Sequence, residues 1–521
     1  MGVDPESERV RLAELVAALS LGIDLGFGQP MEHVLRQCRI ALRIAEIAGL
    51  DEQARSAIYY SALLVNVGCH SDAHEQAYWF GDDIALKAVK YDAEPFSAAD
   101  VLAMLQMLGS GSTPLHRLRI GLDFLLSGRK ELDGMIAGHA RMARSLGEEL
   151  GLPDEVLEAL IASYERWDGR GVPDGLVGVA IPMASRVAHL AEFLEVAYRT
   201  DGVEAAVALG RRRCGTQFDP ALVEIVESDA EKVFQQLDEL DSWDAVIDGE
   251  PGLARTLSAE ECDGALAAIA RFVDLKSPST LGHSEAVATL AAAATAELGL
   301  PIAEQRLVGR AGLVAGFGRL GVSNAIWDKP GPLSAAEWER VRLYPHYTDR
   351  MLHRSRALAA AGRLAGQVRE RLDGSGYPGG LSGPALSLPS RALATAEAFQ
   401  SKLEPRSYRP ASSIAEATRA LRDDVRAGRL DGDVVDAVLR AAGQRVGRRR
   451  AGPAGLTSRE VEVLQHLARG LSNKDIARDL GISPKTVGNH VEHVYTKIGA
   501  DSRAAAGLFA MRHGLLPAGI G

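Results

Sequence analysis

A 28-residue segment occurs twice in this chain, and the repeat is the feature that most limits what the chain can fold into. The two segments, Glu165–Glu192 and Glu370–Glu397, are offset by 205 residues and agree at 14 of 28 positions without a gap. Chance does not produce such agreement, so the chain contains two copies of one domain. Residues 31–48 and 284–298 are rich in Ala and Leu at helical spacing, and strand signals are few. We therefore expect an all-α body.

The domain borders follow from composition. In each copy, the Gly- and Pro-rich segment after the Glu-Arg pair predicts a loop between helices. The acidic stretch 242–252 indicates a junction between the copies, and the Gly-, Arg- and Pro-rich stretch 444–455 indicates a linker. The predicted organisation is domain 1 at residues 1–250, domain 2 at 251–443, the linker at 444–455 and a C-terminal domain at 456–521.

Charge separates the C-terminal end from the body. The chain has a net charge of −11, but residues 445–521 carry +6 and the preceding 444 residues carry −17. A small basic end on a large acidic body favours a DNA reader attached to a domain of another kind. A solvated charged tail would explain the charge alone equally well.

The segment after the linker contains closely spaced helix signals. Thr457 and Glu460 have the spacing of a capping box, and Ser472 is placed to cap a second helix. A short turn at residues 481–483 follows, and Ser483 caps a third helix whose first residue is Pro484. Two short helices joined by a tight Gly turn predict a helix-turn-helix.

The third helix has one apolar and one polar face. Its apolar stripe consists of Val487, Val491, Val494 and Ile498. Opposite this stripe, Asn489 can pair with adenine and Glu492 can accept from a cytosine amine. The candidate DNA-binding residues are Lys485, Thr486, Gly488, Asn489, His490, Glu492, His493 and Lys497, of which Lys485, Thr486, His490 and Lys497 suit phosphate contacts. An amphipathic helix in an ordinary bundle is the alternative.

Residues 456–516 resemble the LuxR-type output domain of bacterial regulators, without gaps in its motif. The resemblance implies four helices, with the third in the major groove and the fourth, over Ser502–Arg512, often pairing two protomers. It also implies that Gly488, Asn489 and Glu492 lie where the family commonly touches bases. Gly488 departs from the longer, often basic residue that is usual there.

The repeated body resembles the HD-GYP branch of the HD phosphohydrolase superfamily, an all-helical fold whose active members bind two or three metal ions and hydrolyse phosphodiesters. In the second copy, His283 and His346 match metal ligands and the loop Asp373–Pro378 is intact. The remaining motif positions differ: Ala315-Gly316 stand at the His-Asp pair, Arg319 at the usual Lys, Val368-Arg369 at the paired histidines and Glu397 at the final Asp.

The first copy keeps still less of the pattern. His33 and His139 match ligands, and Glu192 stands at the final Asp. The other motif positions hold Val65-Asn66, Ser163-Tyr164 and, inside the loop, Val172. Because a two-metal site needs converging imidazoles and carboxylates, we expect a degenerate pair of domains that is not an enzyme and has no metal and no cofactor.

The helix-lined centre of each copy remains a candidate ligand pocket. Its candidate residues are His283, His346, Glu370, Asp373, Glu397, His33, His139 and Glu192. For His283 and His346, the pattern favours satisfied polar residues in a helical core over ligand binding. The sequence does not identify the ligand.

We therefore expect a bacterial regulator of transcription whose HD-like domains serve as a sensor or dimerisation body. Its expected partners are double-stranded DNA, a second copy of the chain, RNA polymerase and a small-molecule ligand. The absence of a long apolar run, of a secretion signal and of paired cysteines predicts a cytoplasmic protein without membrane contact. Two alternatives stay open: a metal-dependent, cyclic-dinucleotide type phosphodiesterase with a DNA-binding domain, and a ligand-free protein-interaction scaffold.

Overall fold

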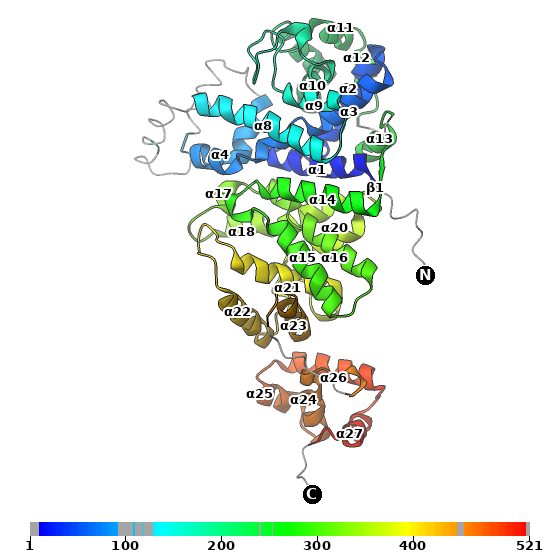
Figure 1. Ribbon diagram of the computed structural model, residues 1–521, viewed down its shortest axis with the longest axis vertical. Coiled ribbons are helices and arrows are strands. Elements are labelled where there is room, and N and C mark those ends of the chain that lie inside the picture. Colours follow the sequence, from blue (N-terminus) through cyan, green and yellow to red (C-terminus); the bar gives the residue numbers. More distant parts are fainter. Residues whose placement is uncertain are drawn as a thin grey trace. The chain divides into compact units, whose positions relative to one another are not determined.

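The structure is a computed structural model that describes residues 10–91, 108–109, 117, 129–238, 241–252, 254–444 and 453–516. The all-α prediction is confirmed, because helices dominate these residues (Figure 1). Among them, the only strands are β1 (Val10–Arg11) and β2 (Thr256–Leu257), which pair antiparallel. No helix in the described part is long and apolar enough to cross a membrane. Most of the predicted linker lies outside the described residues.

The first copy is a run of helices in chain order. They are α1 (Leu12–Gly26), α2 (His33–Ile47), α3 (Glu52–Leu64), η2 (Val67–His70), α4 (Ala73–Phe80), α5 (Asp83–Ala88), η3 (Val89–Tyr91), α8 (Arg129–Glu149), α9 (Asp154–Ile161), η5 (Gly178–Ala180), α10 (Met183–Arg212), α11 (Pro220–Ser228), α12 (Ala230–Val233) and α13 (Ser242–Asp248). The core helices α2, α3 and α10 pack on one another. The acidic stretch predicted as a junction forms α13, whose Trp243 is buried.

The second copy repeats this order. Its helices are α14 (Ala259–Asp274), η6 (Pro278–Thr280), α15 (His283–Glu297), α16 (Ile302–Val314), η7 (Phe317–Gly321), α17 (Asn324–Trp327), α18 (Ala335–Arg342), α19 (Tyr344–Leu352), α20 (Ala359–Ala365), η8 (Gly383–Ala385), α21 (Leu388–Leu403), α22 (Ile414–Arg426) and α23 (Gly432–Ala441). His33 and His283 both begin a helix, and a short 3₁₀ helix follows both α3 and α16. The repeat in sequence is therefore also a repeat in structure.

The C-terminal helices are η9 (Pro453–Gly455), α24 (Ser458–Ala468), α25 (Asn473–Leu480), α26 (Pro484–Ile498) and α27 (Arg503–Arg512). The predicted caps are present: Thr457 and Glu460 form a capping box, and Ser472 and Ser483 each accept a backbone N–H three residues on. Gly481 has a φ of +64°, a left-handed conformation that glycine adopts at no steric cost. The helix-turn-helix prediction is confirmed.

Backbone contacts divide the chain into two compact units. One contains residues up to 288, 310–366 and 404–411, and the other contains 289–309, 367–403 and 412 onwards. The first unit thus includes copy 1 together with part of copy 2. This division does not test the domain borders predicted from the repeat, which stay predictions.

A buried ionic cluster ties the two copies together inside the first unit. The Asp83 carboxylate of α5 accepts hydrogen bonds from Ser323 Oγ and Asn324 N, both at 2.8 Å. Its other oxygen lies 3.2 Å from Lys87 Nζ and 3.3 Å from Lys276 Nζ. Asp83 is fully buried and both ammonium groups are nearly so. These contacts, and the lysines above all, hold the pKa of Asp83 far below its usual range despite the opposing effect of burial.

The Gly- and Pro-rich loops are held by a buried glutamate in each copy. Glu165 accepts hydrogen bonds from Asp174 N, Gly175 N and Leu176 N. Glu370 accepts from Gly379 N and Leu381 N, at the positions equivalent to residues 174 and 176. Both loops contain a cis X-Pro bond. One loop geometry therefore serves both copies, including the first, where Val172 interrupts the motif.

We expect Asp83→Ala to destabilise the protein by about 3–5 kcal/mol, because it leaves two buried ammonium groups without their shared counter-ion. Chemical denaturation followed by circular dichroism measures the change. Asp248→Ala is the matched control, since Asp248 is an exposed helix-end residue. An Asp83→Ala variant as stable as the control would contradict the role of the cluster.

We expect Gly376→Ala to cost about 1–3 kcal/mol of stability through overpacking. A Cβ at Gly376 would lie 2.4 Å from Glu370 Cα, so the loop must move away from its glutamate. Gly264→Ala, in the interior of α14 with no atom near its new Cβ, should be neutral or stabilising. Thermal unfolding of the two variants side by side checks the difference.

Candidate functional site

The centre of copy 1 is built around the Glu192 carboxylate of α10, which is fully buried. Its Oε1 atom lies 2.6 Å from Lys90 Nζ, 2.6 Å from Asn66 Nδ2 and 2.9 Å from Tyr91 Oη, and all three groups donate to it. Burial opposes the charged form, but Lys90 above all outweighs it, and the pKa of Glu192 falls to about 2. The carboxylate is therefore ionised and paired with an ammonium group from the protein itself.

His33 lies beside this centre in a second buried ion pair. Its Nδ1 contacts Glu195, which also accepts from Arg36 Nε at 2.9 Å. Its Nε2 is buried and has no hydrogen-bond partner among the described residues. Burial raises the pKa of the neighbouring Asp24 to about 8, and one oxygen of this carboxyl accepts a hydrogen bond from Val34 N at 3.0 Å.

His139 faces a different set of groups. Its Nε2 lies 2.9 Å from Asp72 Oδ2, and Cys69 Sγ lies 2.9 Å from Tyr164 Oη. Burial opposes the charged imidazolium, but Cys69 and Asp72 together raise the pKa of His139 to about 9. The structure thus places His33, His139 and Glu192 in the buried interior of copy 1, each with a protein partner.

In copy 2 the predicted residues are less well gathered. The His283 Nδ1 atom lies 2.8 Å from Glu404 Oε2, a carboxylate that Arg406 also pairs with at 2.8 Å. His346 is exposed on α19 and close to Tyr347. The interpretation of His346 as a helical-core residue is therefore wrong: its position on α19 turns the ring to solvent, while Tyr344 and Thr348 of the same helix are buried.

The other candidates of copy 2 have structural partners. Glu397 is buried and forms an ion pair with Arg369. Glu370 holds the loop, as described above, and Asp373 accepts from Ser375 N at 3.0 Å at the loop surface. Glu370 and Asp373 therefore shape the loop rather than present free groups to a ligand.

Arg319, which stands where the family motif has a lysine, is a buried cation of copy 2. It is 8% exposed, and its Nε and Nη1 atoms have no hydrogen-bond partner among the described residues. Its guanidinium lies 5.6 Å from the centre of the Tyr344 ring and 5.8 Å from the centre of the Trp327 ring. The two rings fix the position of a charge that lacks a hydrogen-bonded acceptor.

The residues present do not fit the metal centre of the family that the motifs resemble. Ala315 and Gly316 provide no ligand atom, and a Cβ at Gly316 would lie 3.3 Å from Ser284 Oγ. Within the described ranges, no group of three or more His, Cys, Asp or Glu side chains could hold a metal ion.

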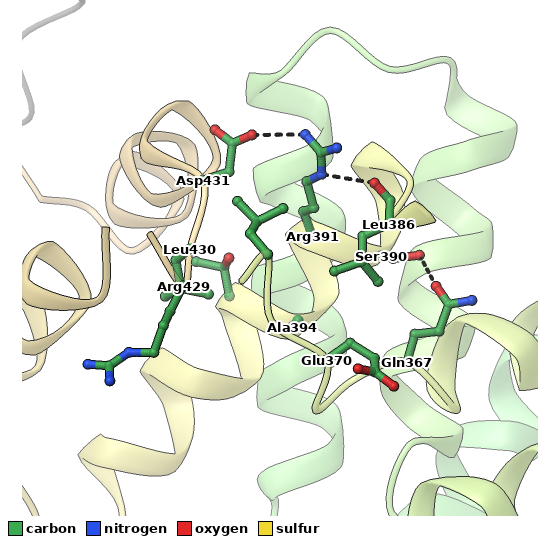
Figure 2. A pocket seen from close by; sticks show the side chains of 11 residues that line it. Gln367, Glu370, Leu386, Ser390, Arg391, Ala394, Arg429, Leu430 and Asp431 are labelled. Atoms are coloured by element: carbon green, nitrogen blue, oxygen red, sulfur yellow. Dashed lines mark hydrogen bonds and ion pairs between the residues drawn. The ribbon is translucent and has the colours of Figure 1, made fainter. Parts of the chain in front are cut away.

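Two pockets accompany these centres. The pocket of Figure 2 lies between the loop of copy 2, α21 and the segment 429–431 that connects α22 to α23. There Ser390 donates to Gln367 at 2.6 Å and Arg391 pairs with Asp431 at 3.1 Å. About 10 Å³ is open to the centre of a water molecule, which is room for one water. In copy 1, a more open pocket of about 510 Å³ lies next to His33, and its lining residues include His33, Arg36, Tyr198 and Arg199.

The helix-turn-helix has two small cores that fix α26. Val487 and Val494 are fully buried, while Val491 and Ile498 are partly buried against these cores, as the apolar stripe predicts. On the opposite face, Lys485, Glu492 and His493 are exposed, and Gly488, Asn489 and His490 are half-buried. Thr486 Oγ1 lies 2.8 Å from the capping Ser483 Oγ. Lys497 Nζ pairs with Glu460 at 2.8 Å, so a phosphate would have to compete for it.

Comparison with known proteins agrees with both resemblances, that of the repeated body and that of the helix-turn-helix. The chain matches the HD domain family over residues 129–222 and 267–434 and the LuxR family of bacterial regulatory proteins over 454–510. It is 32% identical to the 3'3'-cGAMP-specific phosphodiesterase 3 of Vibrio cholerae over 80% of this chain and 91% of that protein. A crystal structure of a cyclic GMP-AMP-specific phosphodiesterase from V. cholerae covers 84% of this chain and 98% of its own, at 29% identity and a TM-score of 0.59.

The C-terminal end has relatives of another kind. It is 48% identical to the transcriptional regulatory protein YdfI of Bacillus subtilis over 61 residues, which are 12% of this chain and 29% of that protein. This match is confined to the DNA-binding part.

These findings correct one expectation. The prediction that the chain is not an enzyme is wrong, because homology to phosphodiesterases extends over four-fifths of it. The prediction rested on a ligand count at motif positions, and such a count does not measure relatedness over the whole body. The chain belongs to the HD domain family, with phosphodiesterases as its relatives, and it ends in a LuxR-family helix-turn-helix domain.

Proposed function

We propose that the chain is a phosphodiesterase-type protein that takes a cyclic dinucleotide into copy 2 and carries its own DNA-binding domain. The relatives supply the ligand class, since their names specify a cyclic dinucleotide. The observation in this chain that carries the proposal is the buried Arg319 guanidinium, whose Nε and Nη1 atoms have no hydrogen-bond acceptor within the described part of the chain.

Arg319 suits a phosphodiester for physical reasons. A buried charge without a hydrogen-bonded partner is costly, so a ligand that supplies acceptor atoms there gains affinity. The planar guanidinium offers several N–H groups in a fixed fork, which matches two oxygens of one phosphate. Asp274, which interacts electrostatically with Arg319, already accepts from Ser284 N and Ser284 Oγ at 2.8 Å. Among the described residues, the hydrogen bonds of the Asp274 carboxylate with nearby polar groups are therefore made to Ser284 and not to Arg319.

The reaction class is hydrolysis of one phosphodiester bond. A water oxygen forms a bond to phosphorus and one P–O bond of the ring breaks. The leaving sugar oxygen takes up one proton of the water, the other passes to solvent, and a linear dinucleotide is released. Arg319 would stabilise the charge on the non-bridging oxygens in the transition state. Because the residues present do not form the two-metal centre that activates water in such enzymes, we expect tight binding and slow turnover.

Replacing Arg319 tests this site. We expect Arg319→Met to weaken the binding of 3'3'-cGAMP to the full chain at least about tenfold, because charge-assisted hydrogen bonds are lost. Isothermal titration calorimetry measures the binding, and Arg350→Met, at an exposed position on α19, is the control. Thermal unfolding of both variants verifies that they fold.

Two results would count against the proposal. Equal affinity of Arg319→Met and the unmodified chain would remove Arg319 from the site. Complete absence of linear product after prolonged incubation with Mn²⁺, Mg²⁺ or Fe²⁺, measured by liquid chromatography, would remove the phosphodiesterase activity. Binding without any product would then leave a regulator that senses the nucleotide.

The DNA-binding end supports a role in transcription. Lys485 is exposed near the N-terminus of α26, where a phosphate contact positions a recognition helix. Asn489 lies one turn further along on the same side, where it can read a base edge. Leu508 and Met511 of α27 are 45% and 61% exposed and offer an apolar surface for a second copy of the chain. RNA polymerase is the further partner that such a regulator would contact.

Replacing Lys485 and replacing Asn489 should affect DNA binding in different ways. We expect Lys485→Ala to weaken binding to all DNA sequences about equally and to lower the salt dependence by about one ion. Asn489→Ala should instead change sequence preference, with a loss of about 1–3 kcal/mol on the preferred site alone. Electrophoretic mobility shifts on specific and random DNA at several salt concentrations separate the two. A uniform loss for Asn489→Ala would contradict direct base readout.

A further inference from the structure

The ammonium group of Lys90 lies in the centre of copy 1, at the end of the segment formed by α5 and η3. Its Nζ atom is 2.6 Å from Glu192 Oε1 and 3.1 Å from Asn66 Oδ1. It is also 5.7–5.8 Å from the ring centres of Phe27, Tyr91, Tyr164 and Phe193. Two oxygen ligands and four aromatic faces together form a cage that is suited to a cation.

The two oxygen ligands stand at positions where the motif has metal-binding aspartates. Asn66 replaces the Asp of the His-Asp pair, and Glu192 replaces the final Asp. Here both side chains contact the ammonium group, and Asn66 also donates to Glu192 at 2.6 Å. The change from Asp to Asn removes one negative charge, which matches the exchange of a divalent cation for a monovalent one.

We propose that Lys90 takes the place of the divalent cation in copy 1, so that the centre of this copy is a built-in cation site that holds no metal. A divalent ion cannot share the site, because it would lie within a few ångströms of the ammonium charge and would find Glu192 Oε1, the oxygen that Asn66 and Tyr91 also contact, already bonded. The inference concerns copy 1 and is independent of the ligand proposed for copy 2.

The same segment connects the cation to the second copy. Asp83, at the start of α5, binds Ser323, Asn324 and Lys276 of copy 2, and Lys90 follows seven residues later. The cation of copy 1 is thus positioned by a segment whose other end is fixed on copy 2. Because Lys90 is part of the chain, its ammonium group is covalently attached to this segment, whereas a bound metal ion would not be.

Metal rescue tests the proposal on the full chain. Lys90→Ala removes the ammonium group, leaves the Glu192 carboxylate unbalanced and opens room for an ion. We expect its melting temperature to fall by roughly 6–15 °C without added metal, and Mn²⁺ to restore part of that loss. The melting temperatures of the unmodified chain and of Lys232→Ala, which alters an exposed lysine, should not respond to Mn²⁺.

The double variant Lys90→Met with Glu192→Gln provides an independent check. Because it removes both charges, it should regain much of the stability that Lys90→Met alone loses. A purely steric role of Lys90 predicts no such recovery. Equal stability of Lys90→Ala and the unmodified chain, or equal Mn²⁺ stabilisation of both, would overturn the proposal.

Metal content decides the question even if the Lys90 variants do not fold. The unmodified chain is incubated with excess Mn²⁺, desalted and analysed by inductively coupled plasma mass spectrometry, alongside Glu192→Gln. We expect no metal that depends on Glu192. Stoichiometric metal that is lost on Glu192→Gln would overturn the assignment of Lys90.

Discussion

A carboxylate that is withdrawn from water stays ionised only where a cation or hydrogen-bond donors balance it, and in each copy the buried glutamate at the position of the final motif Asp is balanced by a cation. Glu192 is paired with Lys90 in copy 1, and Glu397 is paired with Arg369 in copy 2. In HD domains that bind metals, the metal ions would meet this requirement. Here the described residues meet it with side chains of the same chain, so the helical fold keeps its charge balance without the ligand set of a metal centre.

The position of these cations links the centre of copy 1 to copy 2. The Asp83 cluster fixes the start of α5, and Lys90 lies at the end of the same segment. In copy 2, the Nε and Nη1 atoms of Arg319 lack a hydrogen-bonded acceptor among the residues that the structure describes. The proposed division of roles follows: copy 1 pairs the charge of Glu192 with its own Lys90, whereas Arg319 of copy 2 is the cation proposed to bind a phosphodiester.

Much of the fold was predictable because it depends on local signals. The repeat, the all-α class and the caps at Thr457, Ser472 and Ser483 follow from patterns that neighbouring residues determine. The site was not predictable in the same way. Lys90 occurs in no motif, and a lysine in an amphipathic stretch is ordinarily solvated. Only the packing of segments 102 residues apart in sequence brings it to Glu192. The expectation that the chain is not an enzyme was wrong for a related reason. It was drawn from a few motif positions, whereas the similarity to a phosphodiesterase extends over 80% of the chain.

The central claim is that a protein cation, Arg319, rather than a metal ion, receives the ligand proposed for copy 2. Calorimetric titration of the full chain with 3'3'-cGAMP, with and without an excess of EDTA, tests it most directly. The account predicts binding with one ligand per chain and an affinity that EDTA leaves unchanged. Binding that disappears with EDTA and returns with Mn²⁺ would contradict it.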